Sequence, residues 1–275
     1  MSDIKWPFLP SRNIFIERAE GVYLYDDSGH QILDAAGGAI VANVGHGRDR
    51  VVEAVAKATK DTSYIVPPWL TPSRKAMLDV LREHWLPESF TRVHCTSGGT
   101  EANEAAIKLA RKHGHQRRGI EQPVILTAAA SFHGRTLAAV TATGQPKYHK
   151  GFEPMVTGFD YFPYNDLKAL EALINRYEQS GPSIAAVLVE PLQGEGGVNP
   201  GDRTFFSRLR EICTERNILL ILDEVQVGMG RSGRLWGYEQ LGITPDAFTL
   251  AKGLGGGHAI GALLVNASAD VFEPG

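Results

Sequence analysis

The chain has 275 residues, of which 43% are apolar and 21% charged, and its formal net charge is −3. This composition is typical of a globular protein with a buried core, and the length allows one large α/β domain or one and a half ordinary domains. No basic stripe is present, and the longest apolar runs, such as 218–222, are far too short to span a bilayer. We therefore expect neither nucleic acid nor a membrane as a partner.

The first residues and the cysteines bear on the cellular compartment. The opening segment, MSDIKWPFLP, lacks the basic start and the apolar core of a signal peptide. Cys95 and Cys213 are the two cysteines and no CxxC pair occurs, so we expect a reducing cytoplasm and no disulfide framework. His113 and His115 lie two residues apart at an expected helix end. We interpret them as a solvated helix end, and no metal site is predicted.

The first third of the chain is expected to hold a hairpin and two helices. The runs GVYLYD and QILDAA flank Asp27-Ser28-Gly29, which predicts a β-hairpin. Residues 48–60 have the apolar spacing of a helix. After the double proline at 67–68, Thr71-Pro72 is typical of a helix start, and this helix is expected to reach about His84.

From residue 91 onward, strands and helices alternate. The expected strands are 91–96, 124–127, 185–190, 218–222, 247–251 and 260–265, and the expected helices are 100–112, 167–179 and 203–216. Because the strands are apolar on both faces, we predict an α/β fold in which helices cover both faces of a mostly parallel sheet. Such sheets bind ligands at the carboxyl ends of their strands.

Two charged residues stand at such strand ends. Asp223 directly follows the apolar run ILLIL, and a buried carboxylate there needs a cation or several donors. It could pair with a protonated ring nitrogen, or it could cap the following loop. Lys252 follows the strand AFTLA, and six of the nine residues 253–261 are Gly or Ala. A lysine in apolar surroundings becomes a nucleophilic amine, although a solvated lysine is the simpler interpretation of one residue alone.

A glycine turn completes the pattern. Ser97-Gly98-Gly99-Thr100-Glu101 lies between a strand and a helix, where backbone N–H groups and the helix dipole can hold a phosphate; a plain helix cap is the alternative. A phosphate cradle, an acid for a ring nitrogen and an amine for an aldehyde together indicate pyridoxal 5′-phosphate (PLP).

At these residues the chain resembles the class III (ω-amino group) aminotransferases. The matching segments are SGGTEANEAAIKLAR (97–111), FHGRT (132–136), VEPLQGEGG (189–197), LDEVQVGMGRSG (222–233) and TLAKGLGGG (249–257). From Phe132 onward the sequence is most similar to those of the acetylornithine aminotransferases, whereas the first 120 residues resemble the broader ω-aminotransferases. The resemblance implies a fold-type I PLP-dependent transferase that works as a homodimer.

The resemblance also implies individual roles. Lys252 would form the Schiff base and act as the catalytic base and acid, and Asp223 would hold the ring nitrogen. The other residues implied to bind the cofactor are Ser97, Gly98, Gly99 and Thr100 at the phosphate, Val225 and Phe132 on the two ring faces, Gln226 at the ring hydroxyl, and His133 and Glu190 nearby. Arg135 resembles a clamp for the substrate carboxylate, which suits its planar fork. Glu195 resembles a gate that pairs with a distal arginine in relatives.

The expected reaction moves an amino group from N-acetylornithine to the keto acid 2-oxoglutarate, a step of arginine biosynthesis. A 4-aminobutyrate or other ω-amino acid transaminase, which could use pyruvate, is the alternative, as are an aminomutase or racemase and a PLP-binding chain without turnover. The last alternative arises because the chain stops at Gly275, where relatives continue into a C-terminal small domain. We expect residues 1–64 to be part of a small domain and 65–275 to be the large PLP-binding domain.

One motif favours a different class of enzyme. Residues 228–233, GMGRSG, fit the GxGxxG pattern of dinucleotide-binding domains. However, DEVQV separates these glycines from the preceding strand and no sustained helix is expected after them. A nicotinamide-dependent dehydrogenase therefore remains the weaker hypothesis.

Overall fold

The computed structural model describes residues 14–66, 68–179 and 183–273. The expectations for MSDIKWPFLP, for Pro67 and for the final Gly275 lie outside these residues. Within them, no helix combines the length and the apolar character that crossing a membrane requires.

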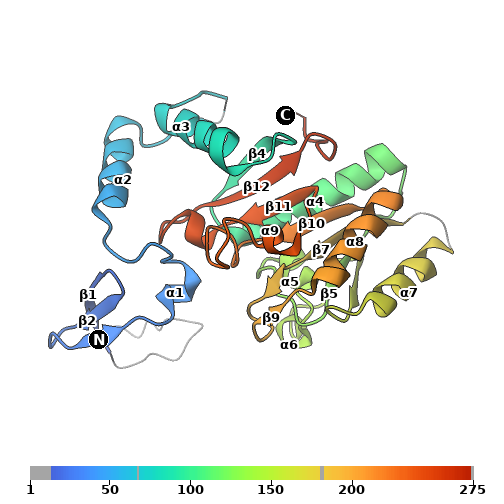
Figure 1. Ribbon diagram of the computed structural model, residues 1–275, viewed down its shortest axis with the longest axis horizontal. Helices are drawn as coiled ribbons and strands as arrows, with labels where there is room; N and C mark the ends of the chain where they lie inside the picture. Colours follow the sequence, from blue (N-terminus) through green and yellow to red (C-terminus); the bar gives the residue numbers. More distant parts are fainter. Residues whose placement is uncertain (1–13, 67, 180–182, 274–275) are drawn as a thin grey trace.

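A seven-stranded sheet forms the centre of the chain from residue 90 onward (Figure 1). In spatial order its strands are β4 (Phe90–Thr96), β12 (Gly261–Asn266), β11 (Ala247–Leu250), β10 (Leu219–Asp223), β7 (Ile184–Val189), β5 (Val124–Ala128) and β6 (Phe159–Phe162). The strands from β11 to β6 pair in parallel, whereas β12 runs antiparallel to both β11 and β4. The predicted mostly parallel sheet is therefore confirmed.

The direction of β12 follows from the short connection before it. Parallel neighbours need a crossover of about a dozen residues or more. Residues 251–260 hold a single 3₁₀ turn, η2 (Lys252–Leu254), so the chain turns back and β12 pairs antiparallel to β11. This turn places Lys252 just beyond the carboxyl end of β11.

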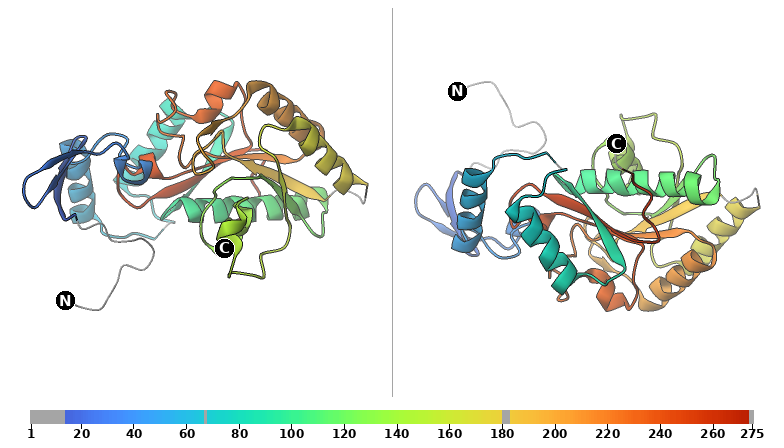
Figure 2. Two further views of the ribbon diagram at one scale, coloured as in Figure 1. Left: turned by 90° about the horizontal axis from the view of Figure 1, so that it is seen from below. Right: turned by 90° about the horizontal axis from the view of Figure 1, so that it is seen from above.

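Helices cover both faces of the sheet (Figure 2). The helices α4 (Gly99–Arg118) and α5 (Leu137–Ala142) pack on one face, into which Ile125 and Leu188 point. The other face is covered by the helices α7 (Leu167–Glu178), α8 (Arg203–Glu215) and α9 (Gly237–Leu241). Leu126 and Val189, the next residues along the same two strands, point into this second core. Because side chains alternate along a strand, strands that are apolar throughout supply both cores.

The helix α4 is longer than predicted, which changes the interpretation of His113. It runs to Arg118 and ends at Gly119, whose φ of 64° is left-handed, as is common at helix ends. His113 therefore lies inside α4 and is buried, so interpreting it as a solvated helix end was wrong, whereas His115 is exposed. No group of three metal-ligating side chains occurs in the described part of the chain.

The N-terminal part lies beside the sheet and forms a separate small unit in Figure 1. Its elements are β1 (Ile16–Glu20), β2 (Tyr23–Asp26), β3 (Gln31–Leu33), α1 (Gly37–Ile40) and α2 (Asp49–Asp61). The next helix, α3 (Pro72–Val80), lies nearer to β4 in Figure 1. The predicted hairpin is β2–β3, and Thr71 caps α3 by accepting from the N–H of Arg74. A π-helical turn over Leu81–Trp85 follows α3, which accounts for the predicted extension to His84.

Several short elements were missed from the sequence. They are β1, α1, β6, α5, α6 (Pro146–His149), α9 and the pair β8 (Leu192–Gln193) and β9 (Asn199–Pro200). None exceeds six residues, so each repeats its pattern too few times to be told from chance. The glycine-rich run 228–233 forms turns, and between the end of β10 at Asp223 and the start of α9 at Gly237 no helix begins. This contradicts the dinucleotide-binding hypothesis, which needs a helix directly after the glycines.

Glu224 joins the end of β10 to α9 and is fully buried. Its two carboxylate oxygens accept from the backbone N–H groups of Gly237 and Tyr238, at 2.7 and 2.8 Å. Burial raises the pKa of Glu224 to about 7, although these two N–H groups favour the charged form. Folding therefore favours the protonated side chain, so its contribution to stability is full below the unfolded pKa and is lost as the pH rises toward 7.

We predict that Glu224→Gln removes part of the pH dependence of folding. The wild-type free energy of unfolding should fall between pH 4.5 and pH 7 by up to about 3 kcal/mol through this group, and the Gln variant should lack that part. Urea unfolding at a series of pH values measures both curves. Glu121→Gln, an exposed change away from α9, is the control; parallel curves for Glu224→Gln and wild type would contradict the prediction.

Candidate active site

A pocket of about 400 Å³ opens at the carboxyl ends of the central strands. Every residue that was implied to bind the cofactor lines it, namely Ser97, Gly98, Gly99, Thr100, Phe132, His133, Glu190, Asp223, Val225, Gln226 and Lys252. Glu195, the implied gate, lines it as well. Segments up to 155 residues apart along the chain therefore meet at one small volume, because parallel strand ends share one edge of the sheet.

Asp223 lies at the bottom of this pocket and is 4% exposed. Its Oδ2 accepts from Asn103 Nδ2 at 2.7 Å and lies 2.8 Å from His133 Nδ1. Its Oδ1 accepts from the backbone N–H of Val225 at 3.0 Å. These donors offset the cost of burying a carboxylate and fix its orientation.

Two titratable neighbours of Asp223 have shifted pKa values. Burial alone would lower the pKa of His133, but its bond to Asp223 and the charges of Asp223 and Glu190 raise it overall. Burial raises the pKa of Glu190 to about 7, partly against the charge of His133 and the N–H of Phe132, which donates to Glu190 at 3.2 Å. The floor of the pocket thus holds a carboxyl group with a pKa of about 7 beside an imidazole whose protonated form is favoured by its carboxylate neighbours.

Lys252 occupies an unusual backbone conformation at the pocket wall. Its φ of 32° is in the left-handed region, which non-glycine residues rarely adopt and which is often found at functional sites. Burial lowers the pKa of its amine, opposed by the charges of Asp223, Glu195 and Glu190. The neutral amine, which is the nucleophilic form, is therefore more readily reached than in an exposed lysine.

The glycine turn packs tightly against the far wall of the pocket. Gly99 begins α4, and a Cβ placed on it would lie 2.8 Å from Val225 Cγ1 and 3.3 Å from Ala251 Cβ. Only glycine allows this approach, which brings the helix N-terminus and its unpaired N–H groups to the pocket. Glu101 turns back and accepts from the N–H of Ser97 at 2.6 Å, so it stabilises the turn.

Arg135 does not line the pocket. It is exposed, and its guanidinium lies 4.8 Å from the ring centre of Tyr148 and 5.6 Å from that of Phe132. Its contacts with the rings of Tyr148 and Phe132 hold the guanidinium behind Phe132, which lines the pocket, so the role of Arg135 as a carboxylate clamp stays a prediction.

Sequence reasoning did not single out Asn103, Val41, His258 or Thr249. The first three line the pocket, and Thr249 contacts Asn103 and Asp223 beneath it. Asn103 carried a usable signal, since it is a polar residue on an otherwise alanine-rich helix face that includes the buried Ala102 and Ala106. Val41 and His258 come from loops whose path the sequence does not indicate.

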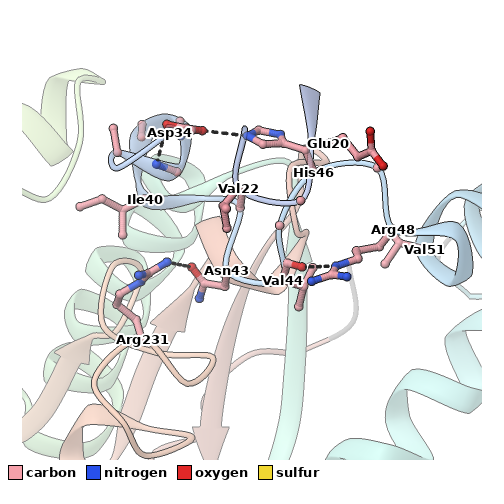
Figure 3. A pocket seen from close by; sticks show the side chains of 18 of the residues that line it. Glu20, Val22, Asp34, Ile40, Asn43, Val44, His46, Arg48, Val51 and Arg231 are labelled. Atoms are coloured by element: carbon pink, nitrogen blue, oxygen red, sulfur yellow. Dashed lines mark hydrogen bonds and ion pairs between the residues drawn. The ribbon is translucent and has the colours of Figure 1, made fainter. Parts of the chain in front are cut away.

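A second, more open hollow of about 1860 Å³ adjoins the pocket and is lined mainly by the N-terminal elements (Figure 3). Asn43 connects these elements to the loop after β10, since it accepts from Arg231 at 2.6 Å and donates to the carbonyl of Met229 at 3.2 Å. Glu195 lines both the hollow and the pocket. Neither Lys252 nor Asp223 lines the hollow, whereas both line the smaller pocket, so we place the candidate active site in the smaller pocket.

Comparison with known proteins gives one family over nearly the whole chain. The family model "Aminotransferase class-III" matches residues 9–275. An acetylornithine aminotransferase of Parasynechococcus marenigrum (strain WH8102) is 63% identical over 94% of this chain and 61% of its own length. Another from Thermosynechococcus vestitus is 52% identical over 95% of this chain and 63% of its own. The chain thus spans about three-fifths of the length of these relatives.

Solved structures agree with the fold. Ornithine aminotransferase from Toxoplasma gondii superposes with a TM-score of 0.88 at 28% identity, covering 99% of this chain and 63% of its own. A PLP-bound amine transaminase from an uncultivated Pseudomonas species gives 0.88 at 29% identity, covering 97% and 66%. The predicted fold-type I architecture is therefore confirmed.

We predict that Lys252 reacts faster than other lysines with an amine-directed reagent. In the chain without cofactor, trace acetylation at pH 8 followed by mass spectrometry should label Lys252 ahead of the exposed Lys168, because burial favours its neutral amine. Equal or slower labelling would contradict this, provided that a small reagent is used so that access to the half-buried amine does not limit the rate.

Proposed function

Because this chain belongs to the class III aminotransferases, we propose that it is a PLP-dependent transaminase that moves an amino group from N-acetylornithine to 2-oxoglutarate. The observation that carries this proposal is that Lys252, Asp223 and the glycine turn line the same 400 Å³ pocket. The high identity to proteins named acetylornithine aminotransferase supports the choice of donor. The reaction would belong to arginine biosynthesis.

PLP is the cofactor of this family, and the residues of the pocket fit it. The start of α4 offers N–H groups for the phosphate, and Val225 and Phe132 offer apolar contact to a flat ring. Asp223 is buried with its acceptor atoms held in place, as the partner of a protonated ring nitrogen must be. When bound, the protonated ring of PLP withdraws electrons from the substrate carbon that loses its proton.

The chain's own residues supply the remaining chemistry. Lys252 would hold the cofactor through its amine. Once freed, the amine of Lys252 would take a proton from the substrate carbon that carries the nitrogen and give it up on the other side of that nitrogen, two atoms away. Its lowered pKa supports this role, because a base must be unprotonated to accept a proton. Asp223 would keep the ring nitrogen protonated throughout, since neighbouring donors stabilise its charged form.

Substrate recognition would involve Arg135 and Glu195. Glu195 lines the opening between the pocket and the adjacent hollow, a suitable place for a gate. Arg135 would turn from its stack on Tyr148 toward a substrate carboxylate, which its fork can bind through two parallel hydrogen bonds.

The larger assembly is part of the proposal. We assign residues 65–275 to the large PLP-binding domain and 1–64 to a small domain, and we expect a cytoplasmic homodimer. Helix α2 supports the expected dimer, because its apolar face is left uncovered. None of its residues is buried, and Val52 and Val55 are exposed, so a second copy of the chain could cover them.

An amine-donor screen tests the reaction. With 2-oxoglutarate as acceptor, N-acetylornithine should give the highest rate, and Lys252→Ala should abolish exchange while Lys168→Ala retains it. Glutamate formation and the absorption spectrum of the protein are followed together. Preference for 4-aminobutyrate would overturn the donor, and PLP binding without exchange from any donor would overturn the transaminase assignment.

A second variant tests substrate binding separately. Arg135→Lys should raise the KM of the donor by about tenfold or more with little change in cofactor affinity, because lysine cannot reproduce the bidentate contact. Steady-state kinetics and PLP titration measure the two effects. An unchanged KM would show that Arg135 contributes only its stack on Tyr148.

A further inference from the structure

Beneath the pocket, Asn103 connects four segments of the fold. It is 2% exposed and lies on α4 among buried alanines. Its Nδ2 donates to Asp223 Oδ2 and to the backbone carbonyl of His133, both at 2.7 Å. Its Oδ1 accepts from the hydroxyl of Thr249 on β11 at 2.8 Å. One side chain therefore joins α4, the loop that carries Phe132, the end of β10 and β11.

These partners leave the amide one orientation. A carboxylate and a carbonyl accept hydrogen bonds and cannot donate them, so Nδ2 must face both. The oxygen then faces Thr249, whose hydroxyl can donate. Asp223 and Thr249 are paired neighbours on β10 and β11, so the sheet itself sets the spacing of this arrangement. The result is a fixed N–H donor aimed at the carboxylate.

A purely structural role does not explain this choice of residue. A buried amide costs free energy unless it is hydrogen-bonded. An alanine, as at the nearby buried positions Ala102 and Ala106, would pack here without that cost. Every polar atom of Asn103 is directed to the surroundings of Asp223. His133, in contrast, contacts Asp223 through Nδ1, and its Nε2 has no hydrogen-bond partner within the described residues.

From this geometry we propose that Asn103 is a positioning residue that holds the carboxylate of Asp223 in place beneath the pocket with a fixed N–H donor, and that Thr249 fixes the amide in turn. The inference rests on the proposed function, since it assigns to Asp223 the ring nitrogen of PLP. Asn103 itself acts through the carboxylate and through the loop of Phe132.

The first test replaces the amide donor of Asn103 by a carboxyl group. Asn103→Asp is nearly isosteric but places a second carboxyl about 2.7 Å from Asp223 Oδ2, so the two must share a proton. We expect the dissociation constant of PLP to rise about tenfold or more, the loss expected for a charge-assisted bond. The ¹⁵N shift of labelled PLP should move toward an unprotonated ring. Asn175→Asp on the exposed face of α7 is the charge-matched control.

The second test leaves the charge unchanged. Thr249→Val removes only the hydroxyl, so Oδ1 of Asn103 is left buried without a donor and the amide is held less firmly against Asp223. It should weaken PLP binding in the same direction as Asn103→Asp but less, and Thr249→Ser, which keeps the donor, should restore the wild-type ring-nitrogen shift. Thermal unfolding of the cofactor-free variants separates these effects from loss of folding.

The outcomes distinguish this inference from the proposed function. If the wild-type chain binds PLP and both Thr249→Val and Asn103→Asp keep its affinity and its ring-nitrogen shift, the role of Asn103 is overturned and the transaminase proposal stands. If the wild-type chain does not bind PLP, the proposed function itself fails. Weakened binding by Thr249→Ser equal to that of Thr249→Val would also overturn the locking role of the hydroxyl.

Discussion

A carboxylate that is buried at the end of a β-strand must be surrounded by donors, and Asp223 imposes this requirement on its surroundings. Its oxygens accept from a helix side chain, a loop histidine and a backbone N–H, so α4, the loop after β5 and the end of β10 must come together. The glycine turn then follows, because α4 can approach this closely only where its first residue has no side chain. The pocket is the space left between these constrained segments.

The same burial sets the protonation of the other groups. Lys252 loses proton affinity, whereas Glu190 gains it and reaches a pKa of about 7. Low solvation disfavours charge on each of them, whereas the carboxylate of Asp223 is surrounded by hydrogen-bond donors. The proposed chemistry needs this contrast, since a neutral amine must move a proton beside an acid that stays charged.

The N-terminal part plays a different role. It contributes few buried side chains and lines the larger hollow, yet Asn43 reaches the loop after β10 and packs against Gly253, next to Lys252. Its exposed apolar residues fit the proposed dimer, in which a second copy would cover them. The pocket and the hollow meet at Glu195, which suits the gating role proposed for it.

The sequence by itself determined the long elements and the chemical groups at strand ends. Apolar periodicity is local, so the helices 203–216 and 48–60 and the buried strands were predicted to within a few residues, as was the position of Asp223 after its strand. Tertiary structure alone decided the antiparallel direction of β12, the burial of His113, the exposed stack of Arg135 and the network around Asn103. These features depend on which distant segments meet, and a pattern of neighbouring residues carries no information about that.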